Sequence, residues 1–396
     1  MLGISTFLIS LPPPFRVYTP QGLLHICVVG FSETRMSSNS RSSTFQAPKN
    51  ETRVLGVDPA AVRIFLRSKG IRVMRAFRLE EVNHPPKLQD IGDLSPSDGN
   101  VKVKIEACGL NFADLLTIQG KYQERPSLPV TMGMEIAGTV IEQGAGIDTP
   151  PVGARVAIYS GQGGLAEYGC FAASQCLVLP DGMPFTDAAA FQIAYGTSHM
   201  ALADRATLQP GERHVEPGAA GGAGLTAVEI GAQMGAEVIA IARGEDKLQI
   251  ARQAGAHHTI DATTTDICDQ IKALGGADVV YDAVGEPLFT ECFRATNPLG
   301  RILAIGFAGG AVPQIPANYM LVKNITVIGF YWGGYNRFAP DRLTGSLQTL
   351  LGWYEAGKLR PHVSHILPLE QVEEGLELLR TRRATGKVVV PPHSPA

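Results

Sequence analysis

The stretch Gly218-Ala-Ala-Gly-Gly-Ala-Gly224 decides the fold of this chain, and it lies between a short segment ending at Pro217 and a helical run from Leu225 to Met234. Glycines at such a turn let the backbone approach a pyrophosphate, and the helix that follows offers free N–H groups and the positive end of its dipole. We therefore expect a dinucleotide to contact Gly218, Ala220, Gly221, Gly222, Ala223 and Gly224.

Short apolar runs alternate with helical segments after this turn. The runs cover residues 237–242, 277–282, 301–306 and 325–329, and each is bounded by Gly, Asn or charged residues. Apolar runs of this length are typical of parallel strands that are buried on both faces of a sheet. The pattern predicts an α/β module with a doubly wound parallel sheet.

Two cations follow the second of these strands. Arg243 lies nineteen residues after Gly224, where a dinucleotide fold places the residue that contacts the ribose. An acid there binds the 2′-hydroxyl of NAD, whereas Arg243 with Lys247 would attract the 2′-phosphate of NADP. The sequence therefore predicts NADPH as the cofactor. The alternative is that both residues are solvated side chains at the start of a helix.

The segment that leads into the turn, His214-Val-Glu-Pro217, departs from the pattern. A central strand of a parallel sheet should be wholly apolar, and a buried carboxylate is costly unless it is protonated or paired. Pro217 also removes a backbone donor from the sheet. We expect either a distorted strand or a partner for Glu216, and a charged carboxylate here would weaken binding of a pyrophosphate.

Residues before the turn indicate a β-rich module. Residues 101–107 alternate apolar and polar side chains, which is the period-two pattern of a half-buried strand. Strand-like runs at 133–142 and 155–159 are flanked by glycines and by Pro150-Pro151, as in a small antiparallel barrel with tight turns. Near the C-terminus, residues 342–357 and 369–380 read as helices and 387–390 as a strand.

Composition and charge exclude several classes of protein. The chain has 396 residues, of which 45% are hydrophobic, and a formal net charge of -3. Residues 1–73 hold nine Lys or Arg and three acids, which leaves the remainder acidic, so we expect no nucleic-acid partner. No apolar run reaches the length of a membrane span. Six scattered cysteines without a CxxC pair indicate free thiols, and we expect a cytoplasmic protein.

The first seventy-three residues carry little information about structure. Residues 1–50 hold eight serines and one acid without sustained periodicity, which resembles a transit peptide in composition. A disordered tail would look similar. The third interpretation, which we adopt, is untranslated sequence upstream of a start at Met74, where a strand-like run begins. Organellar targeting stays open as an alternative to the cytoplasm.

Several motifs in order give residues 74–390 a resemblance to a known family. They are Gly109-Leu-Asn-Phe-Ala-Asp114, Pro129-Val-Thr-Met-Gly-Met-Glu-Ile-Ala-Gly138, the Gly218–Gly224 turn, Tyr281-Asp-Ala-Val-Gly285, Gly300-Arg-Ile-Leu-Ala-Ile-Gly-Phe307 and Ala384-Thr-Gly-Lys387. Together they resemble the zinc-free quinone oxidoreductase branch of the medium-chain dehydrogenase/reductase superfamily. The resemblance implies a GroES-like substrate domain over 74–196 and 332–396, a Rossmann NADPH-binding domain over 197–331, and a homodimer.

The resemblance also implies roles for individual residues. Asn111, Tyr122 and Thr197 match positions that orient or protonate the substrate beside the nicotinamide. Each has a plainer interpretation: Asn111 could satisfy a turn backbone, Tyr122 could be a packing aromatic, and Thr197 could be a helix N-cap. Gly306, Phe307 and Lys387 match cofactor contacts, and Leu116, Tyr331 and Trp332 match the substrate pocket. Lys387 could instead be solvent-exposed. Phe330, which begins the run that resembles a segment lining the nicotinamide and substrate pocket, could be a core residue.

The same comparison of motifs argues against a metal. Zinc-dependent relatives place Cys where this chain has Asn111 and His where it has Met134. An amide and a thioether are poor ligands for Zn²⁺, and Asp114 with Glu135 would make a weak site without nitrogen or sulfur partners. We predict catalysis without a metal.

The sequence thus favours an NADPH-dependent oxidoreductase that transfers hydride to a quinone or an α,β-unsaturated carbonyl. One alternative is an enoyl-thioester reductase, although the acidic body lacks a basic patch for a phosphopantetheine or nucleotide tail. The other is an NADPH-binding protein without catalysis that serves a structural or RNA-binding role. The unusual Glu216-Pro217 pair keeps this last interpretation open.

Overall fold

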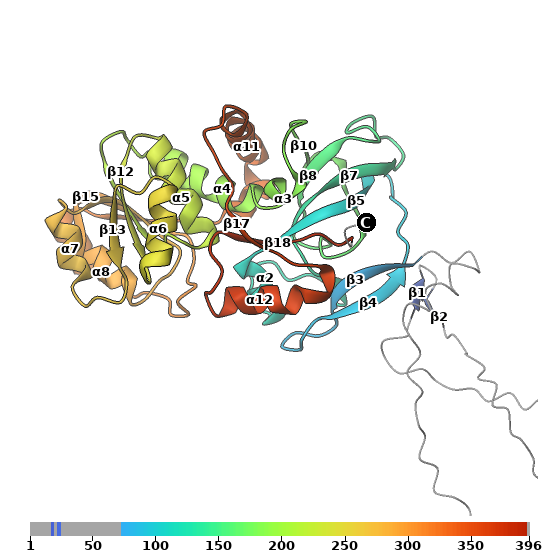
Figure 1. Ribbon diagram of the computed structural model, residues 1–396, viewed down its shortest axis with the longest axis horizontal. Coiled ribbons are helices and arrows are strands. Elements are labelled where there is room, and N and C mark those ends of the chain that lie inside the picture. The colour runs from blue at the N-terminus through green and yellow to red at the C-terminus, as the bar shows by residue number, and fades with distance from the viewer. Residues whose placement is uncertain (1–16, 20–21, 25–72, 394–396) are drawn as a thin grey trace, which may run out of the picture. The chain divides into compact units, whose positions relative to one another are not determined.

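A computed structural model describes residues 17–19, 22–24 and 73–393 (Figure 1). The predicted extension over 1–73 lies almost wholly outside the described residues, so its three interpretations stay predictions. By its internal contacts the chain divides into two units, Met1–Ala76 with Gln89–Asp93 and Phe77–Leu88 with Leu94–Ala396. Strands β1 (Val17–Thr19) and β2 (Gly22–Leu24), in the first unit, form an antiparallel pair. The functional site lies entirely in the second unit.

The β-rich module is a seven-stranded sheet with the order β10-β8-β7-β5-β18-β17, and β9 also pairs with β5. Neighbours are antiparallel except β17 and β18, which are parallel. The C-terminal strand β18 therefore lies directly beside β5 from the N-terminal half (Figure 1). The bounds are β5 (Asn100–Leu110), β7 (Glu135–Gln143), β8 (Arg155–Tyr159), β9 (Tyr168–Ala172), β10 (Cys176–Val178), β17 (Val363–Ile366) and β18 (Lys387–Val390).

Smaller elements complete this module. A three-stranded sheet has the order β4-β3-β6. Its strands are β3 (Val73–Leu79), β4 (Lys87–Gly92) and β6 (Val130–Thr131). The helices are α2 (Phe112–Ile118), α3 (Phe185–Ala188), α4 (Gln192–His199), α10 (Tyr335–Phe338), α11 (Pro340–Glu355) and α12 (Val372–Arg380), with short turns η2 (Ala173–Gln175), η4 (Trp332–Gly334) and η5 (Leu369–Gln371) and the π-helix η3 (Met200–Arg205).

The second module is a six-stranded parallel sheet with the order β13-β12-β11-β14-β15-β16. Its strands are β11 (Arg213–Pro217), β12 (Glu237–Ala242), β13 (His258–Asp261), β14 (Ala277–Asp282), β15 (Thr296–Ala304) and β16 (Thr326–Gly329). Its helices are α5 (Gly222–Gln233), α6 (Glu245–Gln253), α7 (Ile267–Ala273), α8 (Leu288–Ala295) and α9 (Ala317–Lys323). The chain thus has the α/β fold class that the sequence predicts, with a GroES-like sheet domain and a Rossmann sheet domain.

Helices cover both faces of the parallel sheet. Val228 of α5 and Ala251 of α6 pack against Val238 on one face. Ile271 of α7 and Phe293 of α8 pack on the opposite face. Alternate residues of a strand point to opposite faces, so the continuous apolar runs of the sequence supply both layers.

Among the element boundaries that differ from the sequence prediction, two have a clear physical reason. Helix α5 begins at Gly222 rather than at Leu225, because the last three residues of the glycine-rich stretch already form its first turn. Strand β15 begins at Thr296 rather than at Arg301, and its pairing with β14 shifts register between Ala277 and Val279. The irregular start explains why the apolar pattern identified only the second half of this strand.

Candidate functional site

The glycine-rich turn connects β11 to α5, which is where the sequence places it. Backbone N–H groups of Gly218 and Ala219 donate to the carbonyl of Ile241, at 2.9 and 3.1 Å, and hold the turn against β12. A Cβ on Gly224 would collide with the carbonyl oxygen of Gly218. The turn therefore needs glycine here. No side chain caps the start of the twelve-residue helix α5, so its first N–H groups are available to an anion.

The terminal motif Ala384–Lys387 meets this turn. The N–H of Gly386 donates to the carbonyl of Ala220 at 2.8 Å, and Gly386 forms a parallel bridge with Gly221. Gly386 has a φ of +57°, and a Cβ at this position would collide with the carbonyl oxygen of His362. Two motifs that are far apart in sequence are thus joined through their backbones at the predicted pyrophosphate site.

Lys387 forms a buried ion pair with Glu135. Its Nζ donates to Glu135 Oε2 at 2.7 Å and to Asn111 Oδ1 at 2.6 Å. The N–H of Ile193 donates to the other carboxylate oxygen at 2.9 Å. The Lys387 side chain is only 6% exposed and that of Glu135 is fully buried, so the solvent-exposed interpretation of Lys387 is wrong. Hydrogen bonds satisfy both charges, as a buried pair requires.

Asn111 is the N-cap of α2 and takes part in this buried network. Its backbone N–H donates to Asp114 Oδ2 at 2.8 Å. Its side-chain amide donates to the carbonyl of Gly109 and to Glu135 Oε2, both at 3.1 Å. Both amide protons are therefore in use, and a substrate or ribose could reach Asn111 only through the second lone pair of Oδ1. Burial raises the pKa of Asp114 to about 6.

Three cations converge near the predicted ribose position. Lys247 is half-buried and donates from Nζ to the carbonyl of Arg382 at 2.6 Å. Burial lowers the pKa of Lys247, and the charges of Arg243 and Arg382 lower it further. Arg382 follows α12 and also donates to the carbonyl of Ala308 at 2.9 Å. Like charges gathered in this way favour the binding of an anion between them.

The residues predicted beside the nicotinamide come from helix α4 and from the segments that follow β15 and β16. Thr197 lies within α4 and is buried, whereas the N-cap residue of that helix is Phe191, so the N-cap interpretation of Thr197 is wrong. Phe307 follows β15 and is 40% exposed. Phe330 is buried and packs against Tyr335 at a ring separation of 5.6 Å, as its core interpretation expects.

Of the predicted substrate-pocket residues, Tyr331 contacts Tyr122 directly. The rings of Tyr122 and Tyr331 meet edge to face with centroids 6.3 Å apart, and Tyr331 Oη donates to Glu124 Oε1 at 2.9 Å. Trp332 is buried, and its Nε1 has no hydrogen-bond partner. Leu116 is half-buried on α2. Burial raises the pKa of Tyr122, and the charges of Glu124 and Asp114 add to this shift.

The Glu216 side chain lies beside that of His214 on an undistorted strand, without a hydrogen bond of its own. Strand β11 pairs with β12 without a register shift from Arg213 to Pro217. His214 Nε2 lies 3.5 Å from Glu216 Oε2, and both side chains are completely buried. Burial lowers the pKa of His214 to about 3 and raises the pKa of Glu216 well above its ordinary value. A neutral Glu216 beside a neutral His214 would not repel a pyrophosphate.

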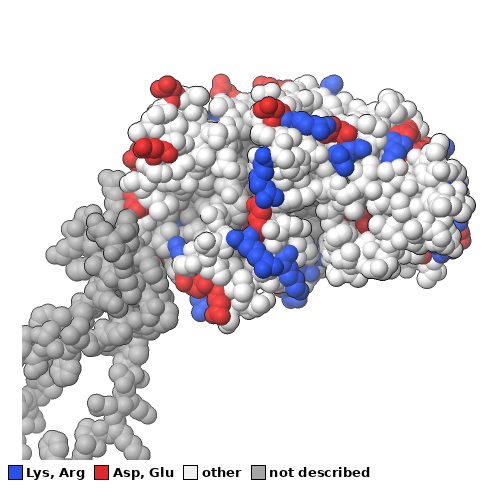
Figure 2. All heavy atoms as spheres, turned by 180° about the vertical axis from the view of Figure 1, so that it is seen from behind, with Lys and Arg blue, Asp and Glu red and all other residues white. Residues whose placement is uncertain are grey.

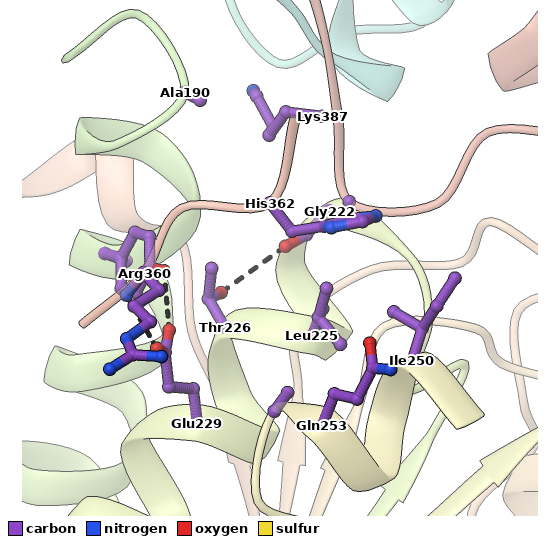
Figure 3. A pocket seen from close by; sticks show the side chains of 13 residues that line it. Ala190, Gly222, Leu225, Thr226, Glu229, Ile250, Gln253, Arg360, His362 and Lys387 are labelled. Atoms are coloured by element: carbon purple, nitrogen blue, oxygen red, sulfur yellow. Dashed lines mark hydrogen bonds between the residues drawn. The ribbon is translucent and has the colours of Figure 1, made fainter. Parts of the chain in front are cut away.

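A cavity of about 450 Å³ borders the turn (Figure 3). Glu229 and Arg360 lie together at one end of it, and Lys387 lies at the other (Figure 3). Glu229 accepts hydrogen bonds from Tyr195 Oη at 2.5 Å and from the N–H of Arg360 at 2.7 Å. Of the predicted site residues, this cavity includes Gly222 and Lys387, while the aromatic group around Tyr122 lies outside its lining.

Charged side chains of both signs are mixed over the surface. Figure 2 shows basic and acidic side chains interspersed on the face it presents, with a short row of Lys and Arg near the middle and no broad surface of one sign. Within residues 73–393, no three His, Cys, Asp or Glu side chains are grouped so as to hold a metal ion. Among the helices that the structure describes, none has the length and apolar character to cross a membrane.

Sequence reasoning missed three functional candidates. His214 was detectable, because residues two apart on a strand share a face with each other. Arg382 had a weaker signal, the basic run Arg380-Thr-Arg-Arg383 after a predicted helix. Glu135 was considered only as a metal ligand, and its pairing with Lys387 had no local signal because the two are 252 residues apart.

Family models and individual proteins of known families both match this chain. Residues 222–344 match the family model of the zinc-binding dehydrogenases, and residues 97–181 match that of the alcohol dehydrogenase GroES-like domain. The chain is 39% identical to a quinone oxidoreductase-like protein 2 homolog of Nematostella vectensis, over 81% of this chain and 90% of that protein. It is 35% identical to quinone oxidoreductase-like protein 2 of Bos taurus, over 81% and 93%.

Solved structures show the same similarity. The quinone oxidoreductase of Thermus thermophilus, which was solved alone and in complex with NADPH, is 31% identical to this chain. It superposes with a TM-score of 0.72 over 80% of this chain and 100% of that one.

Proposed function

The chain belongs to the quinone oxidoreductase branch of the medium-chain dehydrogenase/reductase superfamily, and from this premise we propose that it uses NADPH to reduce a quinone or an α,β-unsaturated carbonyl without a metal. Membership of the family makes it an oxidoreductase. The acceptor, the cofactor and the independence from zinc belong to the proposal.

The cofactor proposal is carried by one observation, the junction of the glycine-rich turn with Gly386 next to the cations Arg243, Lys247 and Arg382. Gly218, Ala220, Gly221, Gly222, Ala223 and Gly224 would hold the pyrophosphate, and the cations would hold a 2′-phosphate. Gly306 and Phe307 would border the nicotinamide end. NADPH supplies hydride when it is bound. The remaining work of the protein is to position the acceptor and move a proton.

We propose roles for individual residues in binding and protonating the acceptor. Thr197 and Trp332 would border the acceptor, together with Leu116 and Tyr331. Tyr122 would protonate the acceptor oxygen. Asn111 and Lys387 would shape the site from the buried side, because both are bonded to Glu135.

The absence of metal chemistry rests on the donor set. Asn111 and Met134 stand where zinc-dependent relatives have thiolate and imidazole, and Met134 is buried in the core. Glu135 is bonded to Lys387, and Asp114 accepts the N–H of Asn111. We therefore expect dialysis against a chelator to leave the activity unchanged.

Turnover tests the proposed function. Purified full-length protein with NADPH should reduce members of a panel of small quinones and enones, measured as loss of NADPH absorbance. An enoyl-thioester should be reduced more slowly than the best simple enone. Oxidation of NADPH with none of these acceptors would overturn the proposal and leave a non-catalytic role.

Arg243 should set the preference between the two cofactors. Replacing it with aspartate puts the acid that binds a ribose 2′-hydroxyl where the cation now attracts a 2′-phosphate. We expect Arg243→Asp to raise the Kd for NADPH at least about tenfold without raising that for NADH, since charge-assisted bonds contribute about 1.5–3 kcal/mol each. Fluorescence titration measures both constants. Lys272→Asp, on α7, is the matched control and should change neither constant.

We further propose a homodimer formed through the edge of the Rossmann sheet. Strand β16 ends the sheet, so its outer backbone groups have no partner within the sheet. Helix α9 precedes it and has no buried residue, and Tyr319, Leu321 and Val322 are 57%, 77% and 76% exposed. A second copy would cover both features. None of the five described cysteines forms a disulfide, which suits a reducing compartment such as the cytoplasm.

Introducing negative charge into the proposed interface tests the dimer. Replacing both Leu321 and Val322 with glutamate should give a monomer, because desolvating two carboxylates in an apolar interface is costly. Light scattering after size-exclusion chromatography measures the mass. Val178→Glu, at an exposed position on β10, should leave the mass unchanged. A wild-type protein that elutes as a monomer would contradict this part of the proposal.

A further inference from the structure

Three tyrosines and one glutamate form a polar group that extends beyond the predicted site. Tyr122 follows α2, Tyr159 ends β8, and Tyr331 precedes η4, so three separate elements bring them together. Tyr331 Oη donates to Glu124 Oε1 at 2.9 Å. A Cβ placed on Gly333 would lie 2.5 Å from Tyr159 Oη and 2.9 Å from Tyr331 Oη, so both hydroxyls point to one spot. We call these four residues the tyrosine cluster.

The members of the tyrosine cluster lie close to one another. The rings of Tyr122 and Tyr331 meet edge to face with centroids 6.3 Å apart, and the hydroxyls of Tyr159 and Tyr331 both lie beside Gly333. Burial raises the pKa of Tyr122 and that of Tyr331, and the bond to Glu124 further disfavours ionisation of Tyr331. Tyr331 contacts both Tyr122 and Glu124, so it connects the two.

The tyrosine cluster lies beside residues predicted to border the nicotinamide. The ring of Tyr159 meets that of Trp332 at a tilt of 66° with centroids 5.0 Å apart. The indole Nε1 of Trp332 in turn lies 2.7 Å from where a Cβ of Gly196 would be, and Gly196 directly precedes Thr197. A proton released within the cluster would therefore be close to a reacting acceptor.

Building on the proposed function, we propose that Tyr159, Tyr331 and Glu124 form a proton-supply chain to Tyr122. Hydride transfer accounts for both electrons that reach the acceptor. The Oη–H bond of Tyr122 then breaks as the acceptor oxygen gains the proton. Tyr331 returns a proton to the Tyr122 phenolate, directly or through Tyr159, and Glu124, which is half-buried and bonded to Tyr331, passes a proton from water to the Tyr331 phenolate. One hydride and one proton are consumed for each acceptor reduced.

Simple packing would also place aromatic rings here, but it does not require the hydroxyls. A packing role predicts that Phe serves as well as Tyr at 159 and 331 and that Glu124 is replaceable. A proton-supply role predicts the opposite. On this account Tyr159 acts only through Tyr122, whereas Tyr331 also borders the proposed acceptor.

The test compares Tyr331→Phe and Glu124→Gln with the wild type, using the best acceptor of the quinone and enone panel. General acid catalysis contributes about 10²–10⁴-fold, so loss of the supply to Tyr122 should lower kcat at least about tenfold with little change in KM for NADPH. A small buffer acid such as imidazolium should restore the rate in proportion to its concentration. The solvent deuterium isotope effect on kcat should rise in both variants. Tyr159→Phe should behave in the same way.

Tyr354→Phe is the matched control. Tyr354 also donates from its hydroxyl to a carboxylate, Asp187 at 2.9 Å, but lies outside the cluster, so its variant should keep the wild-type rate and isotope effect. Titration with NADPH checks that each variant is folded and binds cofactor. Wild-type turnover with unaffected variants would overturn this inference alone. No turnover by the wild type would overturn the proposed function, and this inference with it.

Discussion

Replacing Lys387 with methionine is expected to lower the free energy of unfolding by about 3–5 kcal/mol, because it leaves the carboxylate of Glu135 buried without its cation. Methionine keeps most of the length and apolar volume of the lysine stem, which packs beside Gly222. The loss should therefore come from charge rather than from a cavity. Urea denaturation measures it through the midpoint at constant slope.

A double-mutant cycle separates the effect of removing the whole ion pair from the effect of leaving one charge buried without its partner. Glu135→Gln combined with Lys387→Met should recover much of the lost stability, since a buried pair replaced on both sides is often nearly neutral. Lys104→Met is the control, because Lys104 pairs with Glu106 in a partly exposed position where such pairs contribute about 0–1 kcal/mol. A loss for Lys387→Met no larger than this control would show that the buried pair does not hold β18 against β7.

Replacing both His214 and Glu216 with valine is expected to raise the free energy of unfolding by about 1–4 kcal/mol. Neither side chain makes a hydrogen bond of good geometry, and all four of their polar atoms are buried. Valine suits a central strand of a parallel sheet. Glu237→Gln, on the next strand and 38% exposed, is the control and should change stability by less than about 1 kcal/mol.

The pH dependence of stability follows from the same two groups. The pKa of His214 is about 3 in the folded protein against an ordinary 6.5, so its contribution to stability is full above pH 6.5 and is lost as the pH falls. The pKa of Glu216 is raised above an ordinary 4.5, so its contribution is full below pH 4.5 and is lost as the pH rises. Between pH 4.5 and pH 6.5 the two effects on the free energy of unfolding oppose each other.

Comparison with Glu216→Gln isolates the effect of Glu216, because His214 is present in both proteins. As the pH rises from 4.5 toward the raised folded-state pKa of Glu216, wild-type stability should fall relative to Glu216→Gln by up to about 1.4 kcal/mol per pH unit, the value for one proton. Denaturation series of both proteins at several pH values measure this difference. A difference that does not change with pH would mean that the folded pair holds no extra proton, with Glu216 ionised beside a neutral His214.

The periodic parts of the fold were predictable from sequence because burial on one or both faces imposes a pattern. Strands β8, β12 and β14 occupy the very residues of their apolar runs. The beginning of β15 was missed, since Asn297-Pro298-Leu299 has no strand pattern and pairs irregularly. The start of α5 was missed because glycine, a poor helix former, fills its first turn.

The site was predictable in its motifs but not in its contacts. Spacing located the glycine-rich turn and the cations Arg243 and Lys247, since each depends on local sequence. It could not show that Lys387 turns toward Glu135, nor that Tyr159 joins Tyr122 and Tyr331. Such contacts depend on how distant strands are paired, and a single sequence contains no local signal for that. The domain bounds at 196 and 331 stay predictions, and α4 runs across the first of them.

The central claim is that this chain binds NADPH at its glycine-rich turn although Glu216 lies under that turn. Equilibrium titration of the full-length protein with NADPH and with NADH tests it most directly. The account predicts saturable binding of NADPH with a Kd at least about tenfold below that of NADH, from the charge-assisted contacts to a 2′-phosphate. Failure of both cofactors to bind would contradict it, and would mean that the charge of Glu216 has disabled the turn.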